Sequence, residues 1–217
     1  MQITYPGESP DYRIARAQLV QAEVDLRAQI AKVAAQRRAL PEGGAPPQDY
    51  EFAALDGSTT TLSSLFGSRP TLAIYSLMYS DDADAACPMC VSMLDGLNGQ
   101  AAHIGQRVSL VVVASASTDK LIDLAGTRGW SGLNILSAGS NSYQTDYHGQ
   151  GSDGAQVPMM NVFKETPNGI RHFWGSEGFF APLDGQPRHI DALWPLWNML
   201  DLTPEGRGED WYPALNY

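Results

Sequence analysis

The sequence predicts an α/β fold in which helices flank a central sheet of mixed strand direction. Two nearly continuous apolar runs, residues 71–79 and 108–114, have the composition of strands that are buried on both faces. A segment suited to a helix lies between these runs and another follows the second run, so strands and helices alternate along the chain. Asn168-Gly169 then predicts a hairpin turn, whose antiparallel strands make the predicted sheet mixed.

The composition limits the class of protein. The chain has 217 residues, of which 43% are hydrophobic, and its formal net charge is -10 at pH 7. An acidic chain lacks the cationic face that binds phosphates, so we expect no nucleic-acid partner. No apolar run approaches the roughly 18 residues of a membrane helix, and the first residues do not resemble a secretory signal. We therefore expect a cytoplasmic protein without a membrane partner.

The N-terminal part predicts one long helix. Ser9 is suited to cap this helix and Pro10 to occupy its first turn, and Pro41 ends it. About thirty helical residues span roughly 45 Å, which is longer than a domain of this size needs. We expect the helix either to lie along the domain or to pair with a second copy in a homodimer. Its larger apolar residues recur at helical spacings: Leu19, Leu26, Ile30 and Val33.

A change of composition at residues 42–47 indicates a linker, because Gly and Pro dominate there. We therefore divide the chain into an N-terminal helical extension with its linker, residues 1–45, and a domain, residues 46–217. Residues 137–156 are rich in Gly, Ser and Asn, and we expect a long surface loop that shapes a substrate site. The remaining elements are expected at 51–55 (strand), 61–66 (helical turn), 90–104 and 118–128 (helices), 134–136 (strand), 157–163 and 170–174 (hairpin strands) and 189–200 (helix).

The conspicuous chemical feature is Cys87-Pro88-Met89-Cys90, which contains both cysteines of the chain and follows the apolar run 71–79. Two cysteines within one helical turn can bring their sulfur atoms together without moving the backbone. If Cys87 begins a helix, the exposed N–H groups and the helix dipole stabilise its thiolate. That thiolate can attack a disulfide, and Cys90 can then resolve the mixed disulfide. Tyr75, Tyr79 and Arg69 belong to or precede the strand that leads to Cys87. They could reach such a site, or they could serve only in packing.

One observation argues against this redox hypothesis. The carboxylates of Asp81, Asp82 and Asp84 precede Cys87, and we expect their negative charge to raise the pKa of its thiol. If this effect prevails, the cysteine pair is inactive. The alternative hypothesis is therefore a non-enzymatic binding or dimerisation module. Zinc is a weaker alternative, because Cys87, Cys90 and His103 lack a fourth ligand. We therefore expect neither a metal nor another cofactor.

Several motifs together resemble the thioredoxin superfamily. They are Leu55-Asp56-Gly57 followed by Leu62-Ser63-Ser64-Leu65, the Cys-Pro-x-Cys sequence, the strand 108–114 with its helix, and Val157-Pro158 before a strand. Nearly the whole chain is similar to a bacterial family of thioredoxin-like proteins of unknown function, related to the alkyl hydroperoxide reductase and thiol-specific antioxidant group. That similarity is carried by the helix ending at 37–41, by Arg128-Gly129-Trp130 and by residues 200–208.

The resemblance implies a thioredoxin-like fold and a thiol–disulfide oxidoreductase-like activity. It implies that Pro158 is the cis-proline that sits against the cysteines, and that the backbone of Val157 is an edge on which an extended substrate pairs. The partner is then a disulfide-bearing protein or a small thiol substrate. A peroxiredoxin-like peroxide reductase is a third alternative, although Asp84 stands where the peroxiredoxin motif Pro-x-x-x-Thr-x-x-Cys has its Thr.

Overall fold

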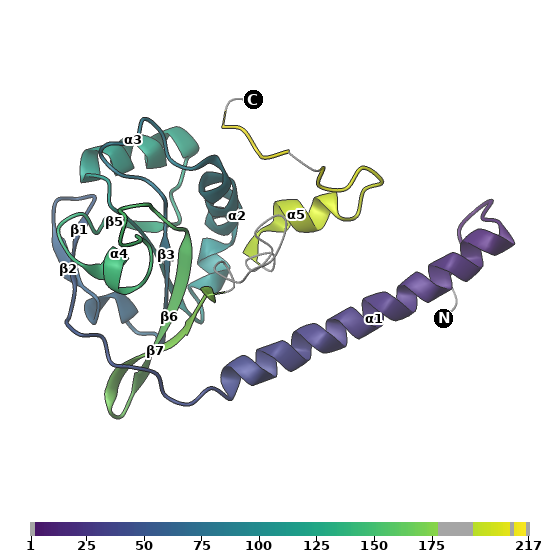
Figure 1. The fold of residues 1–217 in the computed structure, drawn as a ribbon, viewed down its shortest axis with the longest axis horizontal. Coiled ribbons are helices and arrows are strands. Elements are labelled where there is room, and N and C mark those ends of the chain that lie inside the picture. Colours follow the sequence, from purple (N-terminus) through teal and green to yellow (C-terminus); the bar gives the residue numbers. More distant parts are fainter. Residues whose placement is uncertain (1–2, 178–192, 209–210, 216–217) are drawn as a thin grey trace. The chain divides into compact units, whose positions relative to one another are not determined.

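The computed structural model describes residues 3–177, 193–208 and 211–215. The chain divides into two compact units, residues 1–41 and 42–217. Each unit has its own secondary structure, which Figure 1 shows coloured along the sequence. Among the described residues, no helix combines the length and the apolar character that a membrane-spanning segment requires.

The first unit consists mainly of one helix, α1 (Pro10–Arg38), as the sequence predicts. The Ser9 hydroxyl caps it by accepting a hydrogen bond from the backbone N–H of Tyr12 at 3.1 Å. No residue of α1 is buried within the chain. Its larger apolar side chains are largely exposed, with Leu19 at 52%, Leu26 at 60% and Ile30 at 59%. The helix therefore gains little stability from packing inside one chain.

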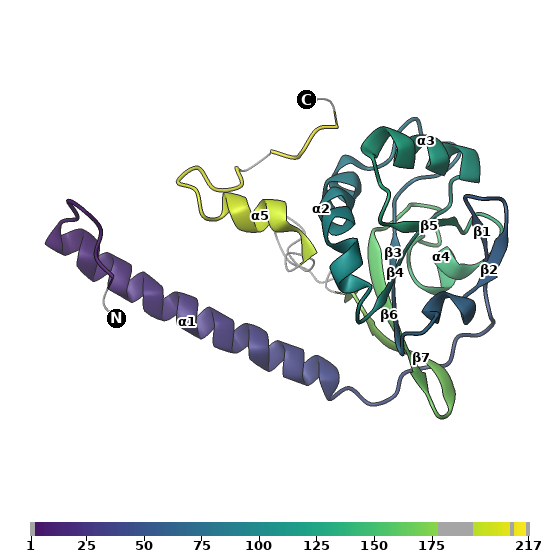
Figure 2. The ribbon, with the colours of Figure 1, turned by 180° about the vertical axis from the view of Figure 1, so that it is seen from behind.

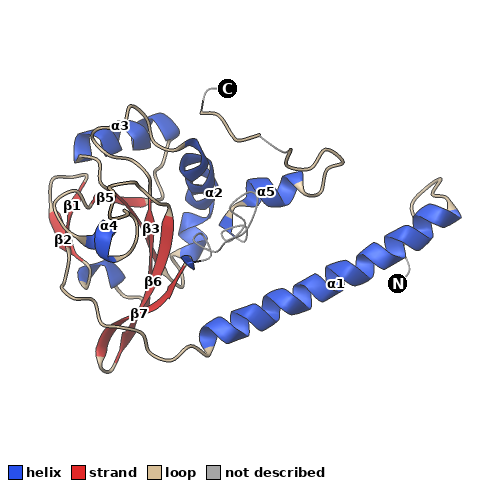
Figure 3. Cartoon of the chain, in the orientation of Figure 1, coloured by secondary structure: helices blue, strands red, loops and turns tan. Residues whose placement is uncertain are grey.

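The second unit is built on a seven-stranded sheet with the strand order β2-β1-β5-β4-β3-β6-β7 (Figure 3). The three central strands β5, β4 and β3 are parallel, and the other neighbouring pairs are antiparallel. The sheet therefore has the mixed direction that the sequence predicts. Its strands are β1 (Glu51–Ala54), β2 (Thr59–Thr61), β3 (Thr71–Ser76), β4 (Ser109–Ala114), β5 (Asn134–Ser137), β6 (Met159–Thr166) and β7 (Gly169–Gly175).

Helical elements cover both faces of this sheet (Figures 1 and 2). On one face, Val112 and Ala114 of β4 pack in a core with Leu94 and Trp197. On the other face, Val111 and Val113 pack in a second core. Burial of alternate residues of β4 on opposite faces confirms the prediction from its continuous apolar run. The helices of this unit are η1 (Ser64–Phe66, a 3-10 helix), α2 (Pro88–Ile104), α3 (Thr118–Arg128), α4 (Tyr143–Asp146) and α5 (Pro195–Leu200).

The segment expected to be a surface loop, residues 137–156, differs from that prediction. It contains α4, and both Tyr143 and Gln144 are buried. The Tyr143 ring packs edge-on against Tyr50 and Phe52, with ring centroids 5.5 Å apart in each pair. The aromatic contacts draw the middle of this segment onto the sheet, so only parts of it lie at the surface.

The C-terminal helix is described over a shorter range than the sequence predicts. The expected range was 189–200, and α5 covers Pro195–Leu200. Residues 189–192 lie outside the described residues. Trp194 and Trp197 are fully buried in the core that also contains residues of α2. These tryptophans therefore pack the C-terminal helix against the core of this unit.

Candidate functional site

Cys87 lies at the carboxyl end of β3, at the start of α2. Its backbone N–H donates a hydrogen bond to the Met78 carbonyl at 3.1 Å, just beyond the last residue of the strand. Cys87 is the capping residue of α2, and Pro88 is the first residue of the helix. Pro88 fits this position because the first helical N–H groups have no partner within the helix. Cys87 and Cys90 therefore lie at the start of a helix, within one helical turn of each other.

The acidic segment before Cys87 is hydrogen-bonded to the start of α3 and to the residue before it. The Asp81 carboxylate accepts a hydrogen bond from the backbone N–H of Ser117 at 2.8 Å, which lowers its pKa. The Lys120 ammonium donates to the carbonyls of Ser80, Asp81 and Ala83, at 3.3, 2.7 and 2.8 Å. The ammonium group of Lys120 therefore contacts the segment that carries the three aspartates.

The two cysteines are free thiols in different surroundings. Cys87 is partly exposed, whereas Cys90 is only 3% exposed. A hydrogen bond from the Cys90 thiol lowers the pKa of Cys87 to about 6, although burial acts in the opposite direction. The backbone N–H groups of Cys90 and Met89, at the start of α2, lower it further.

This result corrects the expectation that Asp81, Asp82 and Asp84 raise the pKa of the Cys87 thiol. The hydrogen bonds that reach the sulfur atom come from Cys90 and the first turn of α2, and they outweigh burial. Short-range donors act more strongly on a thiolate than exposed carboxylates do. All three aspartates are exposed to solvent, which screens their charge.

Cys90 receives hydrogen bonds from the end of β3. The Tyr75 hydroxyl donates to Cys90 Sγ at 3.2 Å, and the backbone N–H of Met78 donates to the same sulfur atom. The pKa of Cys90 is nevertheless raised, because its thiol proton is held in the hydrogen bond to Cys87 and because the group is buried. Sequence reasoning placed Tyr75 near the site but did not identify this contact. Its position on the strand that leads to Cys87 was the available signal.

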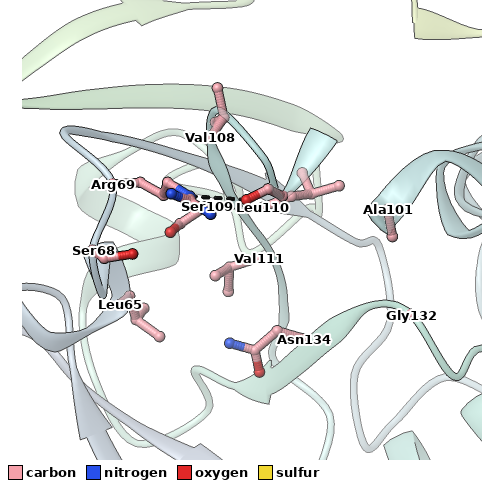
Figure 4. Close-up of a pocket in the computed structure, with 11 residues that line it drawn as sticks. Leu65, Ser68, Arg69, Ala101, Val108, Ser109, Leu110, Val111, Gly132 and Asn134 are labelled. Carbon is pink, nitrogen blue, oxygen red and sulfur yellow. Dashed lines mark hydrogen bonds between the residues drawn. The ribbon is translucent and has the colours of Figure 1, made fainter. Parts of the chain in front are cut away.

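Arg69, in contrast, does not join the cysteine site. It precedes β3 and lies at the opposite end of this strand from Cys87. Its Nε donates to the Gly105 carbonyl at 2.8 Å, at the edge of a cavity of about 290 Å³ (Figure 4). The cavity is also lined by Ser109 and Asn134, at the starts of β4 and β5. It is therefore separate from the sulfur chemistry.

Val157 and Pro158 lie at the same edge of the sheet as the cysteine segment. The next residue, Met159, pairs with Ser76 at the end of β3. The Val157–Pro158 peptide bond is trans, which corrects the expectation of a cis-proline. The backbone N–H of Val157 donates to the Gly149 carbonyl at 3.0 Å, so the segment after α4 already pairs with this residue.

No metal centre is formed by the side chains in residues 3–177, 193–208 and 211–215. Within these ranges, no group of three or more His, Cys, Asp or Glu residues is arranged to hold an ion. Cys87 and Cys90 instead interact with each other and with donors of the protein.

The protein-family model described as "Bacterial protein of unknown function (DUF899)" matches residues 2–217. No curated protein sequence matches the chain. Among solved structures, peroxidoxin BcpB from Mycobacterium tuberculosis is similar, with 16% identity and a TM-score of 0.50, over 72% of this chain and 96% of that one. A cysteine-to-serine mutant of Xanthomonas campestris peroxiredoxin Q has 16% identity and a TM-score of 0.49 over the same shares.

The lipoprotein thioredoxin Etrx1 from Streptococcus pneumoniae is also similar, with 17% identity and a TM-score of 0.43, over 67% of this chain and 98% of that one. The likeness to BcpB confirms the predicted thioredoxin-like fold. At these identities the likeness concerns the fold alone. The chain belongs to the bacterial DUF899 family of proteins of unknown function, and its sheet-containing unit has a thioredoxin-like α/β fold.

Proposed function

We propose that the protein is a thiol–disulfide oxidoreductase in which Cys87 is the nucleophile and Cys90 the resolving thiol. The observation that carries this proposal is the set of hydrogen bonds on Cys87, which lowers the pKa of its thiol to about 6. At pH 7 roughly nine in ten Cys87 side chains are then thiolates. The side chain is also partly exposed, so an external sulfur atom can approach it.

The reaction proceeds in two exchange steps. The Cys87 thiolate attacks one sulfur of a substrate disulfide, a bond forms between them, and the second substrate sulfur leaves as a thiolate. That leaving thiolate takes the proton of the Cys90 thiol. The Cys90 thiolate then attacks Cys87 Sγ, the Cys87–Cys90 disulfide forms, and the first substrate sulfur leaves and is protonated by solvent. The substrate gains two electrons and the cysteine pair loses two, so an external dithiol must reduce the pair for the next cycle.

We further propose that an extended disulfide-bearing substrate lies beside Val157 and Pro158. The positions of Val157 and Pro158 support this proposal. They precede β6, which begins opposite the end of β3, where the segment leading to Cys87 starts. The N–H of Val157 is engaged with Gly149, so its carbonyl is the group that would accept a hydrogen bond from a substrate. Pro158 is buried and would fix the direction of this edge.

A direct test of the function uses the reduced protein and oxidised glutathione as a small disulfide. We expect the Cys87–Cys90 disulfide to form, with a mass loss of two hydrogens and two glutathione thiols released. Cys87→Ser should abolish the reaction, whereas Cys90→Ser should accumulate a glutathione adduct on Cys87. Ser117→Ala is a control variant at the N-terminal cap of α3 that leaves both thiols in place.

Two other outcomes would reject the proposal. If neither oxidised glutathione nor insulin oxidises the pair, the protein is a binding module with the same fold. If hydrogen peroxide is consumed by Cys90→Ser but not by Cys87→Ser, and disulfides do not react, the protein is a peroxide reductase. Peroxide consumption is followed under the same conditions, so the three functions are separated by one set of variants.

A further inference from the structure

We propose that the Tyr75 hydroxyl and the Met78 backbone N–H form a fixed two-donor pocket that stabilises the Cys90 thiolate when it resolves the mixed disulfide. This inference rests on the proposed function, because it assigns a role within the second exchange step. Its basis is the pair of hydrogen bonds that converge on Cys90 Sγ, the one from Tyr75 at 3.2 Å.

The Tyr75 hydroxyl is held in place by the sheet. Tyr75 pairs in register with Val112 of β4 on one side and with Met160 of β6 on the other. The side chain is 1% exposed and lies in the core that includes α2. Its hydroxyl is therefore withdrawn from water, and Cys90 Sγ is the hydrogen-bond acceptor that it reaches. A donor fixed before the reaction needs little reorganisation when charge develops on the sulfur.

The two donors become important only after Cys87 has reacted. In the reduced protein, the Cys90 thiol donates its proton toward the Cys87 thiolate, and this contact keeps Cys90 protonated. When Cys87 enters a mixed disulfide, its negative charge is gone and the Cys90 proton passes to the leaving substrate thiolate. Burial then opposes the new charge on Cys90, while Tyr75 and Met78 favour it.

The order of events follows from this arrangement. Cys87 is the first nucleophile because Cys90 donates to it, and Cys90 becomes the second because two donors remain aimed at its sulfur atom. Hydrogen bonds to a charged group are stronger than neutral ones, and losing one should slow the resolving step about ten- to a hundredfold. The first step, attack by Cys87, should be nearly unaffected, because the Tyr75 hydroxyl donates its hydrogen bond to Cys90 and not to Cys87.

The test follows the reaction of the reduced protein with 5,5′-dithiobis(2-nitrobenzoate), a symmetrical disulfide that releases a coloured thiolate. Attack by Cys87 releases the first equivalent at a rate proportional to reagent concentration. Attack by Cys90 releases the second equivalent at a rate independent of that concentration. We expect Tyr75→Phe to keep the first rate and to slow the second at least about tenfold. The pH midpoint of the second step should also move upward.

The control variant is Tyr143→Phe, which removes a hydroxyl from a buried tyrosine in the core on the other face of the sheet. It should leave both rates and the pH midpoint unchanged. An unchanged second rate in Tyr75→Phe, or equal slowing of both steps, would overturn the role of Tyr75 while leaving the proposed function intact. If the unaltered protein releases no second equivalent, the proposed function itself fails.

Discussion

The replacement Cys90→Ala tests which group makes Cys87 acidic. The Cys90 thiol is the largest cause of the low Cys87 pKa, ahead of the backbone N–H groups of Cys90 and Met89. Alanine removes the S–H donor but keeps both backbone donors. We therefore expect the pKa of Cys87 to rise from about 6 toward, but not to, its ordinary value of 9.0. The change removes one sulfur atom from a buried position and leaves the helix start unaltered.

The size of the effect follows from the titration of a single thiol. With a pKa of about 6, roughly nine-tenths of Cys87 is thiolate at pH 7, and with a pKa of 9.0 roughly one-hundredth is. Because only the thiolate reacts, alkylation at pH 7 should slow by a factor between a few-fold and about ninetyfold. The contribution of the backbone donors decides where in this interval the value falls.

The assay is the rate of alkylation of Cys87 by iodoacetamide between pH 4.5 and 10, read by peptide mass spectrometry. Cys90→Ser serves as the matched variant, because its hydroxyl can still donate a hydrogen bond to Cys87. Its midpoint should lie below that of Cys90→Ala. A midpoint that stays near 6 in Cys90→Ala, with an unaltered near-ultraviolet circular dichroism spectrum, would refute the assigned cause.

Three further predictions concern stability and assembly. Asp95→Ala should lower the free energy of unfolding by about 2–3 kcal/mol in urea denaturation, because Asp95 accepts hydrogen bonds from Arg128 and from Trp130 Nε1; an unchanged midpoint would show that these contacts add no stability. Gly149→Ala should cost about 1–3 kcal/mol in a thermal melt, since its Cβ would lie 2.9 Å from Ser76 Cβ and still closer to Gln144 Oε1. The equivalent change at Gly99, where a Cβ meets nothing, should instead be neutral or stabilising. If α1 pairs with a second copy, light scattering should give a dimer mass that Leu26→Glu converts to a monomer mass, and a monomer mass at every concentration of the unaltered protein would exclude the pairing.

Much of the fold could be predicted because local signals coincide with the element ends. Ser9 and Pro10 begin α1, and Gly129, in the left-handed conformation, ends α3. The continuous apolar runs correctly indicated strands covered on both faces, because a strand with one exposed face would alternate with polar residues. The hairpin at Gly169, with a φ of 93°, followed from the Asn-Gly signal.

The environment of the site could not be obtained in the same way. The contact between Tyr75 and Cys90 joins residues 15 positions apart, and it depends on how α2 lies against β3. The expected effect of the aspartates was wrong because sequence proximity does not show which donors reach a sulfur atom. Tyr143 was assigned to a surface loop because its neighbours are polar, and only the partners Tyr50 and Phe52, far away in sequence, explain its burial.

The anchoring of the segment between β3 and α2 has a consequence for conformational entropy. Residues 77–86 form no helix or strand, but Lys120 donates to three carbonyls there, and the N–H of Ala116 donates to Tyr79 at 3.0 Å. The conformational entropy of this irregular segment is therefore lost when the chain folds, before any partner binds. Binding of a partner near Cys87 then reduces the conformational entropy of the protein by less. A larger part of the interaction free energy therefore contributes to affinity.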